Sequence, residues 1–330
     1  MAHELCRALA AASRGWSGGS PTGAMLTATR SFLAAAAADS DLLGESAESL
    51  GSHEPGAATW IAVTCGTLVE RGAAAELSGP AVVGLFTSWL PKLPIGDEAD
   101  SLPDPTPEQT ALLDLFRYLS QSAVTHLARL PALRAALAND AALLERLGEL
   151  QAVSHGAVWV REALLKSSGT IVFLHPPSAT GLRLRYTNVS NCFHLFSLLQ
   201  TAIGESIPGG RAPSAMIARV ARGTSTEAVD DEAWWHYGNA KSKRAELATS
   251  IWGESLVRDI LTVDGAQVIL AWPPLLQARA WDGGFLGPHL EAMPANAIVE
   301  GPLSTSENEA WLKRLGIRVQ KQWWRLGLAG

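Results

Sequence analysis

The sequence predicts an α+β protein, in which an all-helical N-terminal region is followed by a mixed α/β C-terminal domain with a small sheet. Up to about residue 166, apolar residues recur at three- and four-residue spacing in an alanine-rich background, as in packed helices. Beyond that point, short apolar or alternating runs are typical of strands. Eight of the 12 tryptophans follow residue 230, which also marks the second half. A chain of 330 residues is long enough to form two cores.

The N-terminal half, residues 1–166, is predicted to be a helical domain. Alanine-rich segments predict four helices, over 3–13, 24–38, 57–76 and 79–90. The segment of about 91–107 contains five prolines and several acidic residues, which argue against helix and strand, so we expect an exposed loop. The strongest helical pattern then runs from Leu112 to Leu130. Two more helices are expected, one capped by Asn139-Asp140 and one over 156–166.

The C-terminal half, residues 167–330, is predicted to be a tryptophan-rich mixed α/β domain. The pattern changes at 166–169, and the runs over 170–174 and 182–186 then predict a β-hairpin. Asn191 is a good N-cap residue, so a helix is expected from there to about 204. Further elements are strands over 215–220, 267–271 and 297–299 and a last helix opened by a capping box of Ser306 and Glu309.

Charge is divided unequally between the two halves. Residues 1–165 hold 10 Lys and Arg against 18 Asp and Glu, a formal charge of −8, and the remainder of the chain carries +2. The chain as a whole is acidic, with a formal charge of −6. A broad basic surface for nucleic acid or for an anionic membrane is therefore not expected.

The cysteines favour a reducing compartment. Cys6, Cys65 and Cys192 lie far apart and form no C-x-x-C pair, so neither a disulfide framework nor a cysteine zinc site is expected. The start of the chain lacks the basic cluster of a signal peptide, and no apolar run reaches the roughly 18 residues of a membrane span. We expect a soluble cytoplasmic protein of bacterial type.

No phosphate-binding, dinucleotide-binding or zinc-hydrolase motif is found, so no cofactor and no metal are expected.

Cys192 is the centre of the enzymatic hypothesis. If Asn191 caps the helix, Cys192 lies in its first turn, where free N–H groups and the helix dipole stabilise a thiolate. His175 or His194 would supply the base, and the result would be a hydrolase or acyl transferase of the Cys-His type. The alternative is that Cys192 is a small buried apolar residue of the core.

A run of four ring side chains followed by three cations forms the second candidate site. These residues are Trp234, Trp235, His236 and Tyr237, followed by Lys241, Lys243 and Arg244. Exposed rings stack on a base, a sugar or a peptide side chain while neighbouring cations hold an anion. The alternative is that the rings belong to the core, because successive residues of a strand point to opposite faces.

Two further tryptophans, Trp323 and Trp324, stand among cations near the end of the sequence. Such a pattern is typical of a segment that docks onto a protein partner. It is equally compatible with a terminal helix or strand packed on its own domain.

We therefore favour a non-enzymatic regulatory or adaptor protein, which binds a protein partner or, as a second choice, a small ligand. The first alternative is the Cys-His enzyme centred on Cys192. A weaker alternative is single-stranded nucleic-acid binding by the aromatic and basic run, which the net charge opposes. Membrane binding is not expected.

Overall fold

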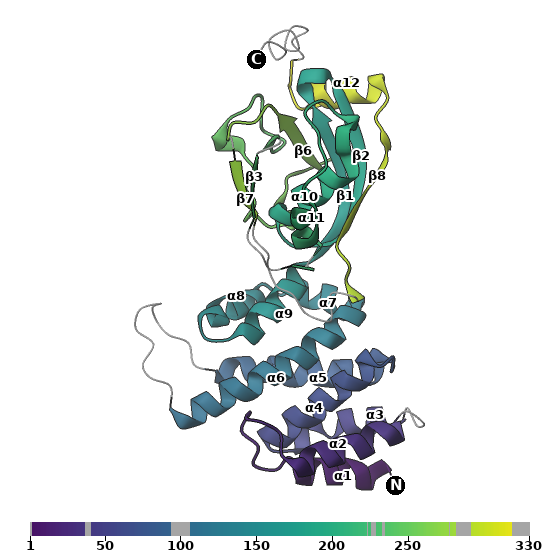
Figure 1. Cartoon of the computed structure of the whole chain (residues 1–330), viewed down its shortest axis with the longest axis vertical. Helices are drawn as coiled ribbons and strands as arrows, with labels where there is room; N and C mark the ends of the chain where they lie inside the picture. The colour runs from purple at the N-terminus through teal and green to yellow at the C-terminus, as the bar shows by residue number, and fades with distance from the viewer. Residues whose placement is uncertain are drawn as a thin grey trace. The chain divides into compact units, whose positions relative to one another are not determined.

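The computed structural model describes most of the chain and divides it into two compact units, Met1–Leu164 and Leu165–Gly330 (Figure 1). The described residues are 2–36, 41–93, 106–222, 224–225, 229–232, 235–276, 278–281 and 292–318. The first unit is helical and the second combines a mixed sheet with helices, so the predicted α+β class is confirmed. No helix in these ranges is long and apolar enough to cross a membrane.

The first unit is an array of α-helices in the residues that the structure describes. Its helices are α1 (Ala2–Ala12), α2 (Gly23–Ala36), α3 (Asp41–Glu48), α4 (Pro55–Glu70), α5 (Gly79–Trp89), α6 (Pro107–Arg129), α7 (Pro131–Ala138), α8 (Ala141–Glu149) and α9 (His155–Leu165). Proline stands in the first turn of α4, α5, α6 and α7, where its missing N–H costs nothing. The expected loop of about 91–107 lies mostly outside the described residues.

α6 is the central helix of this unit, because its apolar stripe packs on both α4 and α5. The Phe86 and Phe116 rings stack with centroids 4.9 Å apart. At the contact with α4, the Ser122 hydroxyl donates to the Ala62 carbonyl over 2.5 Å. A Cβ at Gly66 would lie 2.9 Å from that same hydroxyl oxygen, so glycine permits the close approach of the two helices.

A mixed sheet forms the framework of the second unit. Its strands are β1 (Ser167–His175), β2 (Thr180–Val189), β4 (His236–Gly238), β5 (Thr262–Val263), β6 (Ala266–Trp272) and β8 (Asn296–Pro302), in the order β4-β6-β1-β2-β8 with β5 also paired to β6. β1 and β6 are parallel, with Ile171 opposite Gln267, and the other pairs are antiparallel. A separate ribbon pairs β3 (Val229–Glu232) with β7 (Ala278–Trp281).

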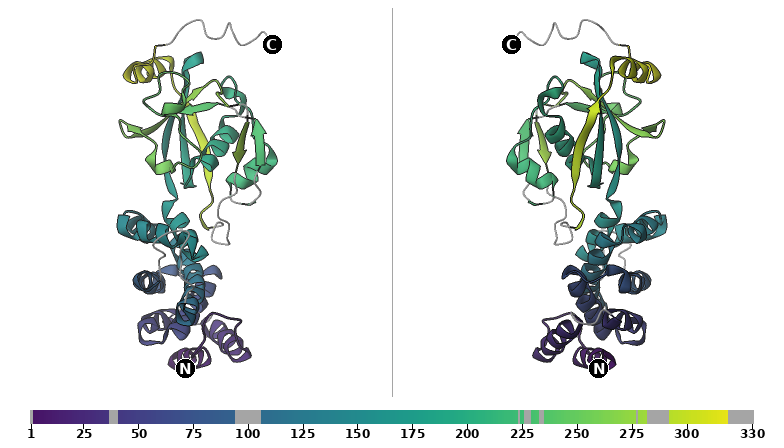
Figure 2. Two further views of the ribbon diagram at one scale, coloured as in Figure 1. Left: turned by 90° about the vertical axis from the view of Figure 1, so that its left-hand side faces the viewer. Right: turned by 90° about the vertical axis from the view of Figure 1, so that its right-hand side faces the viewer.

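Two cores lie on opposite faces of this sheet, because alternate residues of β1 point to opposite sides. Ile171 and Phe173 pack with the residues of α10 (Cys192–Ile203) and α11 (Ala215–Ala221). Val172 and Leu174 pack with those of α12 (Thr305–Arg314). Figure 2 shows α10 and α12 on the two sides of the sheet.

Two of the expected elements are wrong in detail. Residues 215–220 are not a strand but the helix α11, whose N-cap Ser214 accepts from the Ile217 N–H. This apolar run is too short for the spacing of its apolar residues to distinguish a helix from a strand. The last helix begins two residues earlier than expected, because the capping box is formed by Ser304 and Glu307.

Candidate functional site

The start of α10 is already occupied by backbone groups of this chain. Asn191 caps the helix as predicted, its side-chain oxygen accepting from the His194 N–H over 2.9 Å. The Cys192 and Phe193 N–H groups donate to the carbonyls of Ser255 and Gly253, each over 2.9 Å. The free donors that would stabilise an anion at a helix N-terminus are therefore used within the fold.

Cys192 itself lies in the core and has no exposed surface. Burial, together with a smaller effect of the Asp259 carboxylate, raises the pKa of the Cys192 thiol to about 12. A thiol in this environment stays protonated at neutral pH, which is the opposite of what a cysteine nucleophile needs.

The two histidines proposed as bases have other roles in the structure. His175 ends β1, and its Nδ1 lies 2.6 Å from the Ser178 hydroxyl in the turn to β2. Burial lowers the pKa of His175 to about 4. His194 is half-buried in the first turn of α10, where its backbone N–H completes the cap. The Cys-His arrangement stays a hypothesis with no supporting geometry among the described residues.

Substitution of Cys192 separates a core residue from a nucleophile. We expect Cys192→Ser to lower the free energy of unfolding by about 1–3 kcal/mol, because it buries a hydroxyl in an apolar site. Cys192→Ala should fold and should keep whatever the native chain binds. Denaturant unfolding checks the first point, and iodoacetamide should label Cys192 only in denaturant. Rapid labelling of the native chain at pH 7 would contradict the core assignment.

The described part of the aromatic run belongs to the core and not to an exposed surface. Trp235, His236 and Tyr237 are at most 2 % exposed. The Trp235 indole N–H donates to the Pro208 carbonyl over 3.0 Å, and Tyr237 stacks on Phe196 with centroids 3.8 Å apart. These three rings therefore cannot stack on a ligand in this structure. Trp234, Trp323 and Trp324 lie outside the described residues.

The three cations that follow the run have different environments. The Lys243 ammonium donates to the Leu315 carbonyl at the end of α12, so it ties the chain to its own fold. Arg244 forms an exposed ion pair with Glu246, with an N–O distance of 3.2 Å. Lys241 is exposed and lines a groove. Of the predicted binding cations, only Lys241 is therefore placed to meet a ligand there.

This groove lies in a long connection, residues 239–261, between β4 and β5. The connection contains only two short 3₁₀ turns, Leu247–Thr249 and Val257–Asp259. Long irregular loops inside compact domains are uncommon and usually functional or disordered. This one is held firmly, because its backbone is hydrogen-bonded to β4, β6 and the start of α10.

Hydrogen bonds at both ends and in the middle fix the connection. Within the connection, Asn239 N donates to Thr249 O over 2.9 Å, and Ile251 N donates to Tyr237 O of β4 over 2.8 Å. On β6, Val268 N donates to Leu261 O over 3.1 Å. The carbonyls of Gly253 and Ser255, which accept from the first N–H groups of α10, hold the centre of the connection. The loop therefore has a defined surface that can be recognised without first being ordered.

The surface of the connection combines apolar side chains with a groove of about 440 Å³. Three large apolar residues are exposed, Leu247 by 51 %, Trp252 by 46 % and Leu261 by 36 %. The groove is lined by Asn239, Lys241, Ala248, Thr249, Ser250, Ile251, Ser255, Leu256, Asp259, Ile260 and Leu261. We call Leu247, Trp252 and Leu261 together with the groove the loop surface.

Comparison with protein-family models, curated proteins and solved structures gives no match. The function must therefore be argued from the geometry of this chain.

Sequence reasoning identified Lys241 but missed the apolar part of the loop surface. Leu247, Trp252 and Leu261 belong to no periodic pattern, because the connection is neither helix nor strand. One local signal was available: Trp252 stands directly before Gly253, and glycine is typical of turns, which lie at the surface. A Cβ at Gly253 would lie 2.3 Å from the Phe193 ring, so the glycine allows this turn to pack on α10.

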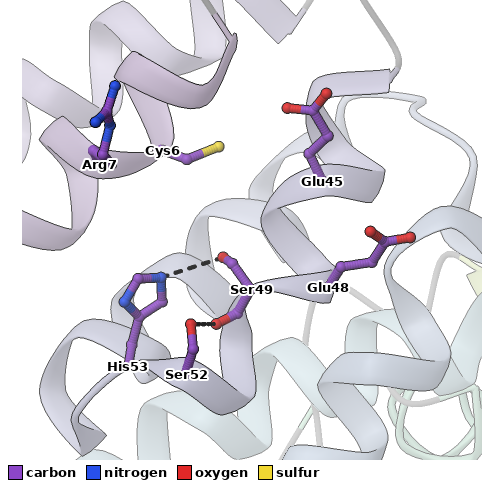
Figure 3. A pocket seen from close by; sticks show the side chains of 7 residues that line it. All are labelled: Cys6, Arg7, Glu45, Glu48, Ser49, Ser52 and His53. Carbon is purple, nitrogen blue, oxygen red and sulfur yellow. Dashed lines mark hydrogen bonds between the residues drawn. The ribbon is translucent and has the colours of Figure 1, made fainter.

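A second hollow, of about 480 Å³, lies in the first unit between α1, α3 and the turn after α3 (Figure 3). The Cys6 Sγ lies 2.9 Å from the Ser46 hydroxyl, whose own proton goes to the Leu42 carbonyl. The thiol is therefore the donor in this pair. Glu45 and Glu48 line the hollow, but the described residues contain no group of three or more His, Cys, Asp and Glu that could hold a metal ion.

Proposed function

We propose that this protein is a non-enzymatic regulator or adaptor, which binds a protein partner through the loop surface of its second unit. The observation that carries the proposal is the exposure of Leu247, Trp252 and Leu261 on a connection that is rigidly held. Keeping three large apolar side chains in water is unfavourable, and exposed apolar surface around a groove is typical of interaction sites.

The composition of the loop surface supports a protein partner. Tryptophan is enriched among the residues that contribute most to protein interfaces, where a ring anchors in a pocket of the partner. Lys241 and Asp259 supply charge at the same groove, which adds specificity more than affinity. The three cysteines are free and buried, which supports a cytoplasmic setting for this interaction.

The other two functions have less support. Cys192 is buried and protonated, and its helix end is occupied by carbonyls. Stacking of single-stranded nucleic acid needs exposed rings, whereas Trp235 and Tyr237 are core residues.

The test is retention of a partner from an extract of the source cells on the immobilised full-length chain, followed by titration of the purified partner. Trp252→Ala should weaken binding roughly 30-fold, the effect of losing about 2 kcal/mol at an interface anchor. Leu26→Ala is the matched control, because Leu26 is an exposed apolar residue of the first unit. Both variants should keep the thermal stability of the native chain, within about 0.5 kcal/mol. A partner held equally by both variants, or no retained partner at all, would overturn the proposal.

A further inference from the structure

We propose that the groove of the loop surface takes an extended peptide segment of the partner, with an acidic and a basic side chain on either side of an apolar one. This inference rests on the proposed function and specifies the partner's chemistry. It is carried by the two charges of the groove, Lys241 and Asp259, and by the apolar residues that line the same groove.

Neither Lys241 nor Asp259 forms an ion pair within the described part of the chain. Arg244 is paired with Glu246, and the Lys243 ammonium is bound by the Leu315 carbonyl. Lys241 and Asp259 are both exposed at the groove. Their charges are therefore available to a bound molecule, and neither is needed to hold the loop in place.

The two charges enter the groove from different parts of the connection. Lys241 lies two residues after Asn239, whose N–H donates to the carbonyl of Thr249 in the first 3₁₀ turn. Asp259 belongs to the second 3₁₀ turn, where its N–H donates to the Leu256 carbonyl over 3.0 Å. A ligand with one sign of charge would meet attraction at one of these residues and repulsion at the other. A segment carrying both signs complements the groove.

The rest of the lining favours a peptide as the occupant. Ile251, Ile260 and Leu261 provide an apolar wall for one side chain of the segment. Thr249 and Ser250 add hydroxyl oxygens, which can accept from the N–H groups of a peptide backbone. A volume of about 440 Å³ lies near the lower end of ligand sites, so it admits a few side chains of a segment and not a folded domain.

Selection of displayed random peptides on the full-length chain tests this inference. Selected peptides should carry an acidic and a basic residue flanking an apolar one. Lys241→Glu should weaken their binding about tenfold or more, and replacing the peptide's acidic residue by lysine should restore it. Asp259→Lys should show the reciprocal behaviour with the peptide's basic residue. Lys241→Glu and Asp259→Lys change exposed side chains, so thermal unfolding should match that of the native chain.

The outcomes separate this inference from the proposed function. If peptide binding requires Trp252 but is unchanged by Lys241→Glu and by Asp259→Lys, the inference is overturned and the proposed function still stands. The same holds if the chain retains its protein partner but selects no peptide, or if a small zwitterion alone occupies the groove. Failure to retain any partner overturns the proposed function, whatever the peptides show.

Discussion

Replacing Trp235 by alanine is expected to lower the free energy of unfolding of the second unit by about 3–5 kcal/mol, the range for large aromatic truncations in a core. Trp235 is almost completely buried and lies against Phe173 of the central strand, with ring centroids 5.3 Å apart. Its indole N–H also donates to the Pro208 carbonyl. Truncation therefore leaves a cavity and removes the hydrogen-bond donor of the Pro208 carbonyl.

Hydrogen exchange of the full-length chain measures this effect where it occurs. The protected amides of β1 and β6 report on the second unit, whereas a single melting curve would mix the two units. Trp252→Ala is the control, because an exposed tryptophan should change these amides by less than about 0.5 kcal/mol. Unchanged protection in Trp235→Ala combined with loss of the partner would assign Trp235 to a binding surface after all.

The parts of the fold that depend on local chemistry were predictable from the sequence. Asn191 has the side chain of an N-cap, and the structure uses it as one. The alternating run over 182–186 forms β2, paired with β1 in the expected hairpin. Both features depend on residues within a few positions of one another, so the sequence contains all that decides them.

The burial of the aromatic run depends on contacts that the sequence does not reveal. β4 pairs with β6, so that His236 lies opposite Trp272. α10 then places Phe196 against Tyr237. These pairings depend on the packing of the whole sheet. From the sequence alone, many other apolar runs in the chain are equally plausible neighbours of the aromatic run.

The loop surface could be predicted only in part for a related reason. Lys241 was a candidate because it follows the rings in the sequence. Its position at the groove arises because the connection folds back on β4, through the Ile251 N–H, and on α10, through the carbonyls of Gly253 and Ser255. A surface made by such backbone contacts has no periodic pattern of its own.

Acidification is expected to destabilise the first unit through His126, by up to about 3 kcal/mol between pH 6.5 and pH 4. His126 is completely buried on α6, and burial lowers its pKa to about 4. Its Nδ1 lies 2.7 Å from the Ser122 carbonyl, which can only accept, so Nδ1 carries the proton of the neutral ring. Nε2 then accepts from the Ser78 hydroxyl over 2.8 Å.

The direction of this pH effect follows from the proton count of the two states. The unfolded chain binds a proton at His126 near its usual pKa of 6.5, whereas the folded chain resists protonation down to about pH 4. The stabilisation that depends on neutral His126 is therefore fully present above pH 6.5. It is lost progressively as the pH is lowered from 6.5 to about 4. The charge of Arg129 acts in the same direction as burial.

Hydrogen exchange of the α6 amides as a function of pH measures the contribution of His126. His126→Gln should remove most of the pH dependence in that window, because glutamine keeps a polar side chain but does not titrate. The variant should be less stable at every pH, because glutamine does not fill the site of the imidazole. The quantity to compare is therefore the slope of the free energy of unfolding against pH. His175, whose pKa is also lowered to about 4, acts in the second unit and is followed separately at β1. If His126→Gln leaves the pH dependence of α6 amide protection unchanged, other groups cause the acid sensitivity of the first unit.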